Sequence, residues 1–406
     1  MISKHIMNYS RTILLGRWLV VLLSLGAASL MSCGRQASFD STTIISLDPE
    51  GDVQANSIVR VNFEVRSPFD PFTIVVLPDT QLYSEKHPEI FIAQTQWIRD
   101  HAESHNIVFV SHLGDIVEHD DTFEYEWQNA STAMRLLDGV VPYGFLAGNH
   151  DMQSDGKAIF YQAYFPASRY EGYPWWGGSY NGNKNNYQLF SAGGEDYLFL
   201  HMEYCPPDDV LTWARDVLES QPARKAILST HAYINTRANK GIGCNYKSEG
   251  NNNGTRIWNQ VVRPSENLFW VLNGHFPGAA RVSETVGDRL VHQLLSNYVG
   301  QNGYLRLMTF HPNIDMVKIQ TYSPTLDDYL VGCENEFELP FHMLGGALPT
   351  GWVTITDGVD VCTAPLEQGY CDLRITTSGV RTITAIYTGD HRYDESRSME
   401  ISLRVE

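Results

Sequence analysis

The stretch that decides the fold is the apolar run from Pro142 to Ala147 followed directly by Gly148-Asn149-His150-Asp151. The run reads as a buried strand, and the four residues after it place a glycine before three side chains that can bind ligands. In α/β folds, chemistry of this kind lies where strands end. By itself the stretch also fits a tight turn, because Gly, Asn and Asp are the commonest turn residues.

Similar polar residues close four other apolar runs of the chain. They are Asp79-Thr80-Gln81, Gly114-Asp115, His231 and Gly274-His275. Because the ends of parallel strands meet at one edge of a sheet, we expect these side chains to be neighbours. Carboxylate, amide and imidazole groups suit divalent ions such as zinc, manganese or iron. The pattern therefore predicts a site for two metals, about 3.5 to 4 Å apart, which could clamp a phosphate ester and activate water.

Apolar strand-like runs alternate with helix-like stretches from Thr73 to Leu272. This alternation predicts a layered α/β domain with a largely buried sheet. From Val282 to Tyr322 strand-like runs follow one another, so we expect a second, more antiparallel sheet there. The run from Glu118 to Asp121 could approach the predicted site, but an exposed acidic loop is the interpretation that we favour.

The order of these blocks, Asp-x-(His), Gly-Asp, Gly-Asn-His-(Asp/Glu), His and Gly-His, resembles that of the calcineurin-like metallophosphoesterases over residues 72–322. The resemblance implies a layered β-sandwich flanked by helices, an αββα fold, in a catalytic domain of residues 68–345. It also implies that metal-bound hydroxide hydrolyses phosphate monoesters or diesters, with no phospho-enzyme.

The resemblance also assigns roles to individual residues. It gives Asp79 and Gln81 to a first metal, Asn149, His231 and His275 to a second, and Asp115 to a bridge between them; His150 would contact the phosphate and protonate the leaving group, with Asp151 holding its imidazole.

The chain departs from the family pattern at two positions of the first metal site. Gln81 stands where the family usually has histidine, and a neutral amide oxygen is a weaker ligand than imidazole. Pro277 stands where the family has the second histidine of Gly-His-x-His, and proline cannot bind a metal. Three readings follow: a loosely held first metal, an enzyme with one metal, or a degenerate and inactive domain.

The stretch from Tyr170 to Asn186 is rich in aromatic residues, glycine and asparagine, with little helix or strand pattern. A long loop near a site is either a lid over the substrate or a packed surface crossing. We favour the lid, with Trp175 and Trp176 as candidate substrate-binding residues.

The two ends of the chain read as parts of one all-β unit. Beyond about Gly346 helices disappear, and alternating strands carry Tyr387-Thr388-Gly389-Asp390, which resembles a bacterial immunoglobulin-like repeat. Such repeats usually begin with two more strands, and Thr43 to Arg66 could supply them. We therefore predict one discontinuous sandwich, residues 38–67 and 346–406, into which the catalytic domain is inserted. The alternative is an independent N-terminal hairpin that packs on the catalytic domain.

Residues 1–32 have the layout of an export signal, with Lys4, Arg11 and Arg17 before an apolar run from Trp18 to Leu30. The following Cys33 resembles the lipidated cysteine of a bacterial lipobox. The resemblance implies a lipoprotein of the bacterial cell envelope, facing the periplasm or the surface. A plain secretory signal with a free Cys33 is the alternative.

The net charge of the chain limits the kinds of partner that it can bind. Loss of residues 1–32 removes three positive charges and takes the formal charge from −18 to −21, which argues against nucleic acid. We expect a small phosphate ester as substrate and the membrane as a partner through Cys33. The competing function is a non-catalytic cell-surface binding or adhesion protein.

Export also permits disulfides. Cys362 with Cys371 is the first choice for a bridge and Cys205 with Cys244 the second, which leaves Cys333 unassigned.

Overall fold

The computed structural model describes residues 53–63, 71–244, 252–300, 302–343, 351–388, 396–398 and 400–406. The predicted signal, Cys33 and the strand expected from Thr43 to Leu47 lie outside these residues. Within the described ranges, no helix is both long and apolar enough to cross a membrane.

One mixed sheet has its strands in the order β14-β13-β12-β2-β3-β4, with β15 paired to β13. The bounds are β2 (Phe72–Leu77), β3 (Ile107–His112), β4 (Tyr143–Gly144), β12 (Leu305–His311), β13 (Met316–Ser323), β14 (Asp328–Tyr329) and β15 (Phe337–Pro340). Strands β2, β3 and β4 run parallel, whereas β12 and β13 join antiparallel. The apolar run before Gly148 thus holds only a two-residue strand, shorter than predicted.

A second mixed sheet has the order β10-β11-β9-β8-β7-β6-β5. The bounds are β5 (Trp176–Tyr180), β6 (Asn185–Ala192), β7 (Glu195–Met202), β8 (Lys225–Thr230), β9 (Leu268–Asn273), β10 (Gly278–Val286) and β11 (Arg289–Asn297). Strands β7, β8, β9 and β11 are parallel. The expectation of a separate antiparallel sheet from Val282 to Tyr322 is wrong, because β10 and β11 extend this sheet while β12 and β13 extend the other.

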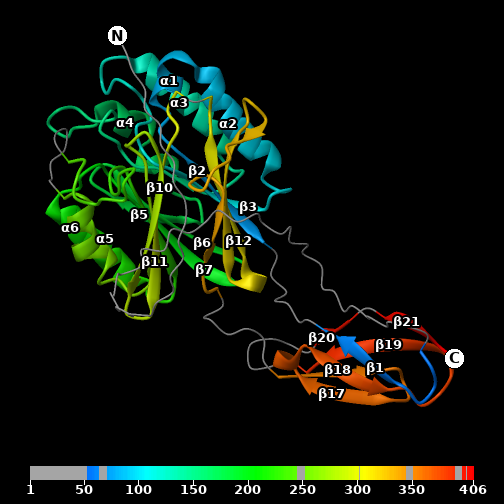
Figure 1. Ribbon diagram of the computed structural model, residues 1–406. Coiled ribbons are helices and arrows are strands. Elements are labelled where there is room, and N and C mark those ends of the chain that lie inside the picture. Colours follow the sequence, from blue (N-terminus) through cyan, green and yellow to red (C-terminus); the bar gives the residue numbers. More distant parts are fainter. Residues whose placement is uncertain are drawn as a thin grey trace, which may run out of the picture. The chain divides into compact units, whose positions relative to one another are not determined.

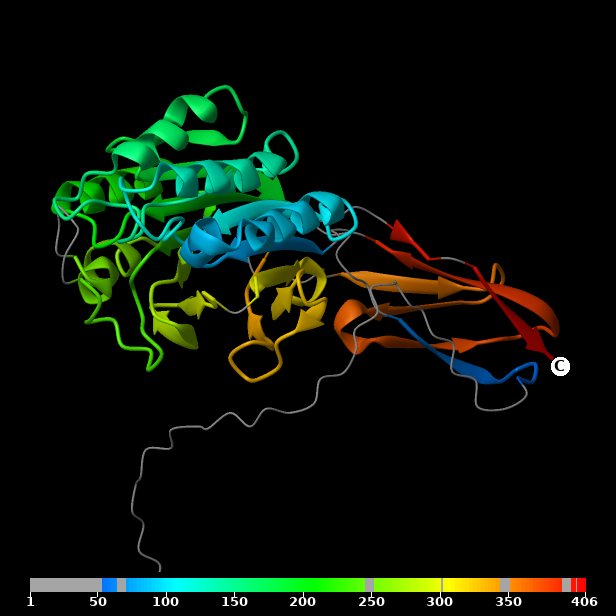
Figure 2. The ribbon, with the colours of Figure 1, turned by 90° about the horizontal axis from the view of Figure 1, so that it is seen from above.

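The two sheets face each other across a shared apolar core, and helices cover their outer faces (Figures 1 and 2). Strand β2 shows why its sequence is continuously apolar. Ile74 and Val76 enter the core between the sheets, while Val75 and Leu77 enter the core under the helices. A strand with two buried faces needs apolar residues at every position. The mixed α/β fold with several sheets is therefore as predicted.

The helices fall into two groups. Helices α1 (Gln81–Lys86), α2 (Pro88–His101), α3 (Glu124–Met134) and α4 (Ile159–Tyr164) contribute to the core of the first sheet, and α5 (Asp208–Ser220) and α6 (Gly254–Ile257) to that of the second. Short helical segments are η1 (Arg135–Leu137), η2 (Ala167–Arg169), η3 (Trp258–Val262), η4 (Pro312–Ile314) and η6 (Leu366–Gln368). Helix α5 is typical of these helices. Two aspartates occupy its first turn, where their negative charge interacts favourably with the positive end of the helix dipole. Its apolar residues recur on one buried face.

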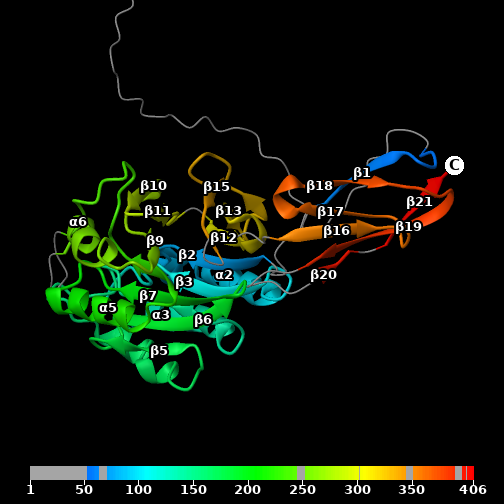
Figure 3. The ribbon, with the colours of Figure 1, turned by 90° about the horizontal axis from the view of Figure 1, so that it is seen from below.

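A smaller all-β region unites the two ends of the described chain (Figure 3). Strand β1 (Ile58–Asn62) pairs antiparallel with β18 (Tyr370–Arg374). The other strands are β16 (Trp352–Thr356), β17 (Val361–Pro365), β19 (Gly379–Tyr387), β20 (Ser396–Arg397) and β21 (Ile401–Val405), which form one further sheet. Val59, Val61 and Phe63 share one apolar core with residues from these C-terminal strands.

Both predicted disulfides are confirmed. Cys362 pairs with Cys371, and Cys205 pairs with Cys244. Cys333 is free and exposed.

Candidate metal centre

The predicted ligands follow the carboxyl ends of strands from both sheets. Asp79 follows β2, Asp115 follows β3, Asn149 follows β4, His231 follows β8 and His275 follows β9. Because these strands are parallel within each sheet, their carboxyl ends lie at the same edge.

Four of the predicted ligand atoms surround one point. Nε2 of His231 lies 3.0 Å from Oδ2 of Asp115, 3.1 Å from Oδ1 of Asn149 and 3.2 Å from Nδ1 of His275. Asp115, His231 and His275 form the group within the described residues whose donor atoms could hold a metal ion. The structure thus brings together every residue predicted for the second metal.

The orientation of His231 shows that this point suits a cation. Its Nδ1 lies 2.8 Å from the carbonyl of Leu113, which can only accept, so Nδ1 carries the hydrogen. Nε2 therefore faces a carboxylate oxygen and an amide oxygen. Either a proton on Nε2 or a metal ion at this point satisfies these lone pairs, and the donor set is one that zinc, manganese and iron accept.

Buried charges dominate the pKa values of this cluster. Burial by itself would lower the pKa of His231, but the charge and hydrogen bond of Asp115 raise this pKa to about 9. His231 in turn lowers the pKa of Asp115 below its usual range, although burial acts in the opposite direction. Burial lowers the pKa of His275 to about 4, and the charge of His231 contributes. Burial raises the pKa of Asp79 to about 8, with Asp115 adding to the rise. The cluster therefore holds two buried carboxylates that a divalent ion would stabilise.

Asp79 is bound by a residue that the sequence did not single out. Asn297, at the end of β11, donates from Nδ2 to Oδ2 of Asp79 at 2.7 Å, and the backbone N–H of His275 donates to the same oxygen at 3.0 Å. Gln81 begins α1 and is buried, and its Oε1 has no hydrogen-bond partner. A buried amide oxygen that has no hydrogen-bond partner and lies two residues after Asp79 fits a role as a metal ligand.

Glycines precede Asn149 and His275, because the backbone at both places lies against the carboxylate of another ligand. A Cβ on Gly148 would lie 2.2 Å from Oδ1 of Asp115, and one on Gly274 would lie 2.1 Å from Oδ1 of Asp79. Asp115 and His275 themselves have positive φ angles of 49° and 71°. Strained backbone of this kind is common at functional sites.

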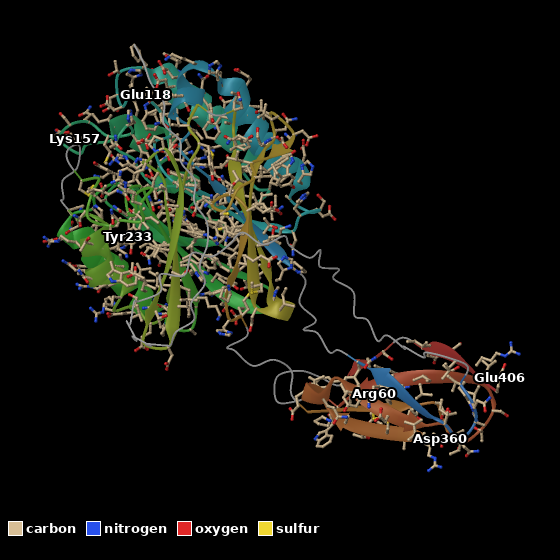
Figure 4. The ribbon with its side chains drawn as sticks, viewed as in Figure 1. Arg60, Glu118, Lys157, Tyr233, Asp360 and Glu406 are labelled. Carbon is tan, nitrogen blue, oxygen red and sulfur yellow. A yellow bond between two sulfur atoms is a disulfide. The ribbon has the colours of Figure 1, made fainter. Side chains whose placement is uncertain are left out.

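His150 is half-buried and contacts Asp115 and Glu118, whose carboxylate Oε2 lies 3.7 Å from Nδ1 of His150. Its backbone N–H donates to Oδ1 of Asp115 at 2.9 Å, and its Nδ1 lies 2.8 Å from the carbonyl of Glu118. Burial lowers the pKa of His150, but Asp115 and Glu118 raise it by more, so the net shift is upward. Figure 4 labels Glu118 in the region of α1 and α3.

The predicted contact between Asp151 and the imidazole of His150 is wrong. Asp151 is fully buried, and its carboxylate accepts instead from the backbone N–H groups of Ile116, Val117 and Gly148 at 2.8 to 3.1 Å. It therefore joins the loop after β3 to the loop after β4. The expectation of an exposed acidic loop is also wrong, because residues 118–121 are half-buried and the carbonyl of Glu118 lies 2.8 Å from Nδ1 of His150.

The rings of Trp175 and Trp176 pack against other aromatic rings. Trp175 lies 6.1 Å from Tyr143 and 5.0 Å from Tyr173, and Trp176 stacks on Tyr170 at 5.3 Å, measured between ring centroids. These contacts support the packed surface crossing and correct the preference for a lid. Substrate binding by the two tryptophans stays a prediction that no contact supports.

Comparison with known proteins agrees with this geometry. Residues 72–300 match the sequence profile of the family described as calcineurin-like phosphoesterase. The chain belongs to this family. Its candidate metal site and its membership together support phosphoester hydrolysis.

The individual proteins that resemble the chain are either distant from it in sequence or much longer than it. The chain is 37% identical over 299 residues to the uncharacterised protein YvnB of Bacillus subtilis (strain 168), a match that covers 70% of this chain but only 22% of that protein. A dimetal phosphatase from Danio rerio is 12% identical with a TM-score of 0.44 and covers 67% of this chain and 100% of its own. A putative 5'-nucleotidase from Staphylococcus aureus is 10% identical with a TM-score of 0.40 and covers 68% and 55%.

Proposed function

We propose that the chain is an exported, metal-dependent hydrolase of small phosphate monoesters or diesters that works with two divalent ions, zinc, manganese or iron. The observation that carries the proposal is the convergence of Asp115, Asn149 and His275 on Nε2 of His231. Ions bound there would neutralise the charge of the ester and activate water as the nucleophile.

Specific residues of the chain would bind the two metal ions and assist the leaving group. Asp115, Asn149, His231 and His275 would hold the second ion, and Asp79 with Gln81 the first. His150 lies beside Asp115 and offers its Nε2 to the leaving group, because its Nδ1 is engaged by the carbonyl of Glu118. The absence of a histidine at Pro277 makes the first ion the more exchangeable one.

Metal analysis combined with hydrolysis assays tests the proposal. We expect the metal-loaded protein to hydrolyse p-nitrophenyl phosphate or its bis ester, and Asp115→Ala or His150→Ala to lower turnover by at least about a hundredfold. Asp372→Asn, on the exposed face of β18, is the control and should leave turnover unchanged. Absence of turnover with zinc, manganese and iron would favour the alternative, a non-catalytic cell-surface binding protein.

We further infer that Cys33 anchors the protein to the bacterial envelope and that residues 38–67 and 346–406 form an immunoglobulin-like module. The shared core of Val61 with the C-terminal strands supports the second inference. Cys33→Ser should move the protein from the membrane fraction to the soluble fraction. If the protein is soluble with Cys33 intact, the plain secretory signal is correct.

A further inference from the structure

His150 is held by a loop whose position depends on a buried carboxylate that has no part in the metal centre. Glu126, in the first turn of α3, is completely buried. We propose that Glu126 is a positioning residue that fixes the imidazole of His150 through the peptide group between Glu118 and His119. This inference rests on the proposed function, in which His150 serves the leaving group.

One peptide group separates the carboxylate from the imidazole. Its carbonyl, from Glu118, lies 2.8 Å from Nδ1 of His150, and its N–H, from His119, donates to Oε2 of Glu126 at 3.0 Å. In a planar trans peptide the oxygen and the hydrogen point in opposite directions. Glu126 and His150 therefore lie on the two sides of the same peptide group.

Glu126 makes further contacts that hold this peptide in place. Its Oε2 also accepts from the backbone N–H of Glu118 at 2.9 Å, and its Oε1 lies 2.9 Å from Nδ1 of His119. The next residue of α3, Trp127, donates from its indole N–H to the carbonyl of Asp120. The start of α3 thus fixes three consecutive residues of the loop.

The contact decides which nitrogen of His150 faces the substrate. A carbonyl oxygen can only accept, so Nδ1 of His150 carries a hydrogen and Nε2 is the nitrogen available to a substrate. A carboxylate that accepts from the N–H of a peptide polarises its carbonyl and strengthens the hydrogen bond on the other side. Glu126 thereby performs, through one peptide, the orienting task that the sequence suggested for Asp151.

The chemistry that depends on this orientation is proton delivery to the departing alcohol. Water adds its oxygen to phosphorus, the bond between phosphorus and the leaving oxygen breaks, and that oxygen takes the second proton of the imidazolium form of His150, the one on Nε2. The proton lost by the attacking water restores the histidine. Esters of poor leaving groups need this proton, whereas 2,4-dinitrophenolate, a very good leaving group, leaves without it.

The first test compares wild type with Glu126→Gln on aryl phosphates of graded leaving-group pKa. We expect kcat/KM to fall about 10- to 100-fold for phenyl phosphate but less than about threefold for 2,4-dinitrophenyl phosphate, the pattern of lost general-acid assistance. Glu124→Gln is the matched control, because Glu124 lies in the same helical turn and binds the hydroxyl of Tyr164 instead of the loop. Equal losses on both esters would overturn the proposal.

A double variant tests whether Glu126 acts through His150. After His150→Ala, adding Glu126→Gln should cause no further loss, since the residue through which it acts is gone. Independent, multiplicative losses would contradict the proposal. If Glu126→Gln does not fold, Glu126→Asp keeps the charge on a shorter side chain and should show an intermediate dependence on the leaving group.

Nitrogen NMR of the histidine side chains gives a readout that needs no turnover. The signal of His150, assigned by its loss in His150→Ala, should show the Nδ1–H tautomer in wild type and a tautomer mixture in Glu126→Gln. An unchanged tautomer would overturn the proposal even if activity fell. A changed tautomer in a protein that hydrolyses no ester would uphold the positioning and overturn only the proposed function.

Discussion

Asn297 donates a hydrogen bond from its side-chain amide to Asp79 over 2.7 Å, although 218 residues separate them in sequence. The amide oxygen of Asn297 accepts in turn from the backbone N–H of Val299 at 2.9 Å, so the amide has one orientation. Asn297 thus orients the carboxylate of Asp79, the residue proposed for the first metal.

Replacing Asn297 should weaken the first metal selectively. Asn297→Leu removes the donor to Asp79, and loss of such a supporting hydrogen bond typically lowers metal affinity 10- to 100-fold. Metal content after dialysis, measured by mass spectrometry, should fall toward one ion per chain. Asn267→Leu, whose amide binds the end of α5, is the control; equal metal loss in both variants would contradict a specific role.

Metal binding should stabilise the fold. The centre buries Asp79 and Asp115 together, and a ligand that binds only the folded state at a hundred times its dissociation constant adds about 2.7 kcal/mol. Zinc or manganese should therefore raise the melting temperature, and a chelator should reverse the rise. Asp115→Asn should abolish the shift; a shift that persists in this variant would place the ions elsewhere.

Two buried histidines should make the fold sensitive to acid. Burial lowers the pKa values of His112 and His201 to about 3, from 6.5 in the unfolded chain. Below about pH 6.5 the unfolded chain binds protons that the folded chain cannot, so stability is complete above that pH and falls as the pH drops toward 3. Each histidine accounts for up to about 1.4 kcal/mol per pH unit. In urea titrations from pH 7.5 to 5, His201→Gln should flatten this dependence, whereas the exposed His342→Gln should not.

The disulfide between Cys205 and Cys244 should contribute strongly to stability. It closes a segment of 39 residues, for which the loss of chain entropy in the unfolded state predicts about 4 kcal/mol. The double variant Cys205→Ala/Cys244→Ala should therefore unfold at a clearly lower denaturant concentration. Cys333→Ala, which removes the free thiol, is the control, and equal midpoints for all three proteins would refute this prediction.

A charge in β1 should disrupt the distant C-terminal strands. Val61 is fully buried in their core, so Val61→Asp would bury an unpaired carboxylate at a cost of several kcal/mol. Hydrogen exchange should accelerate across residues 351–406. Ile58→Asp is the control, because the side chain of Ile58 on the same strand is 67% exposed. Unchanged exchange in Val61→Asp would favour the independent hairpin.

The sequence by itself determined the features that local pattern encodes. Continuous apolar runs such as β2 marked strands buried on both faces, and a glycine before Asn149 or His275 marked the end of an apolar run where side chains that can bind ligands follow. The sequence also predicted both disulfides. The strands and the glycines follow from residues a few positions apart, where the period of the backbone restricts what the chain can do. The disulfides follow from the small number of cysteines that can pair.

Only the tertiary structure decided the hydrogen-bond partners of the predicted site residues. It gave Asp79 the amide of Asn297, because β11 joins β9 and brings its end to the metal edge. It turned Asp151 toward backbone N–H groups and gave His150 the carbonyl of Glu118. A hydrogen bond depends on where two loops meet and which way a peptide group faces. Sheet order and loop packing set both, and no local spacing in the sequence records them.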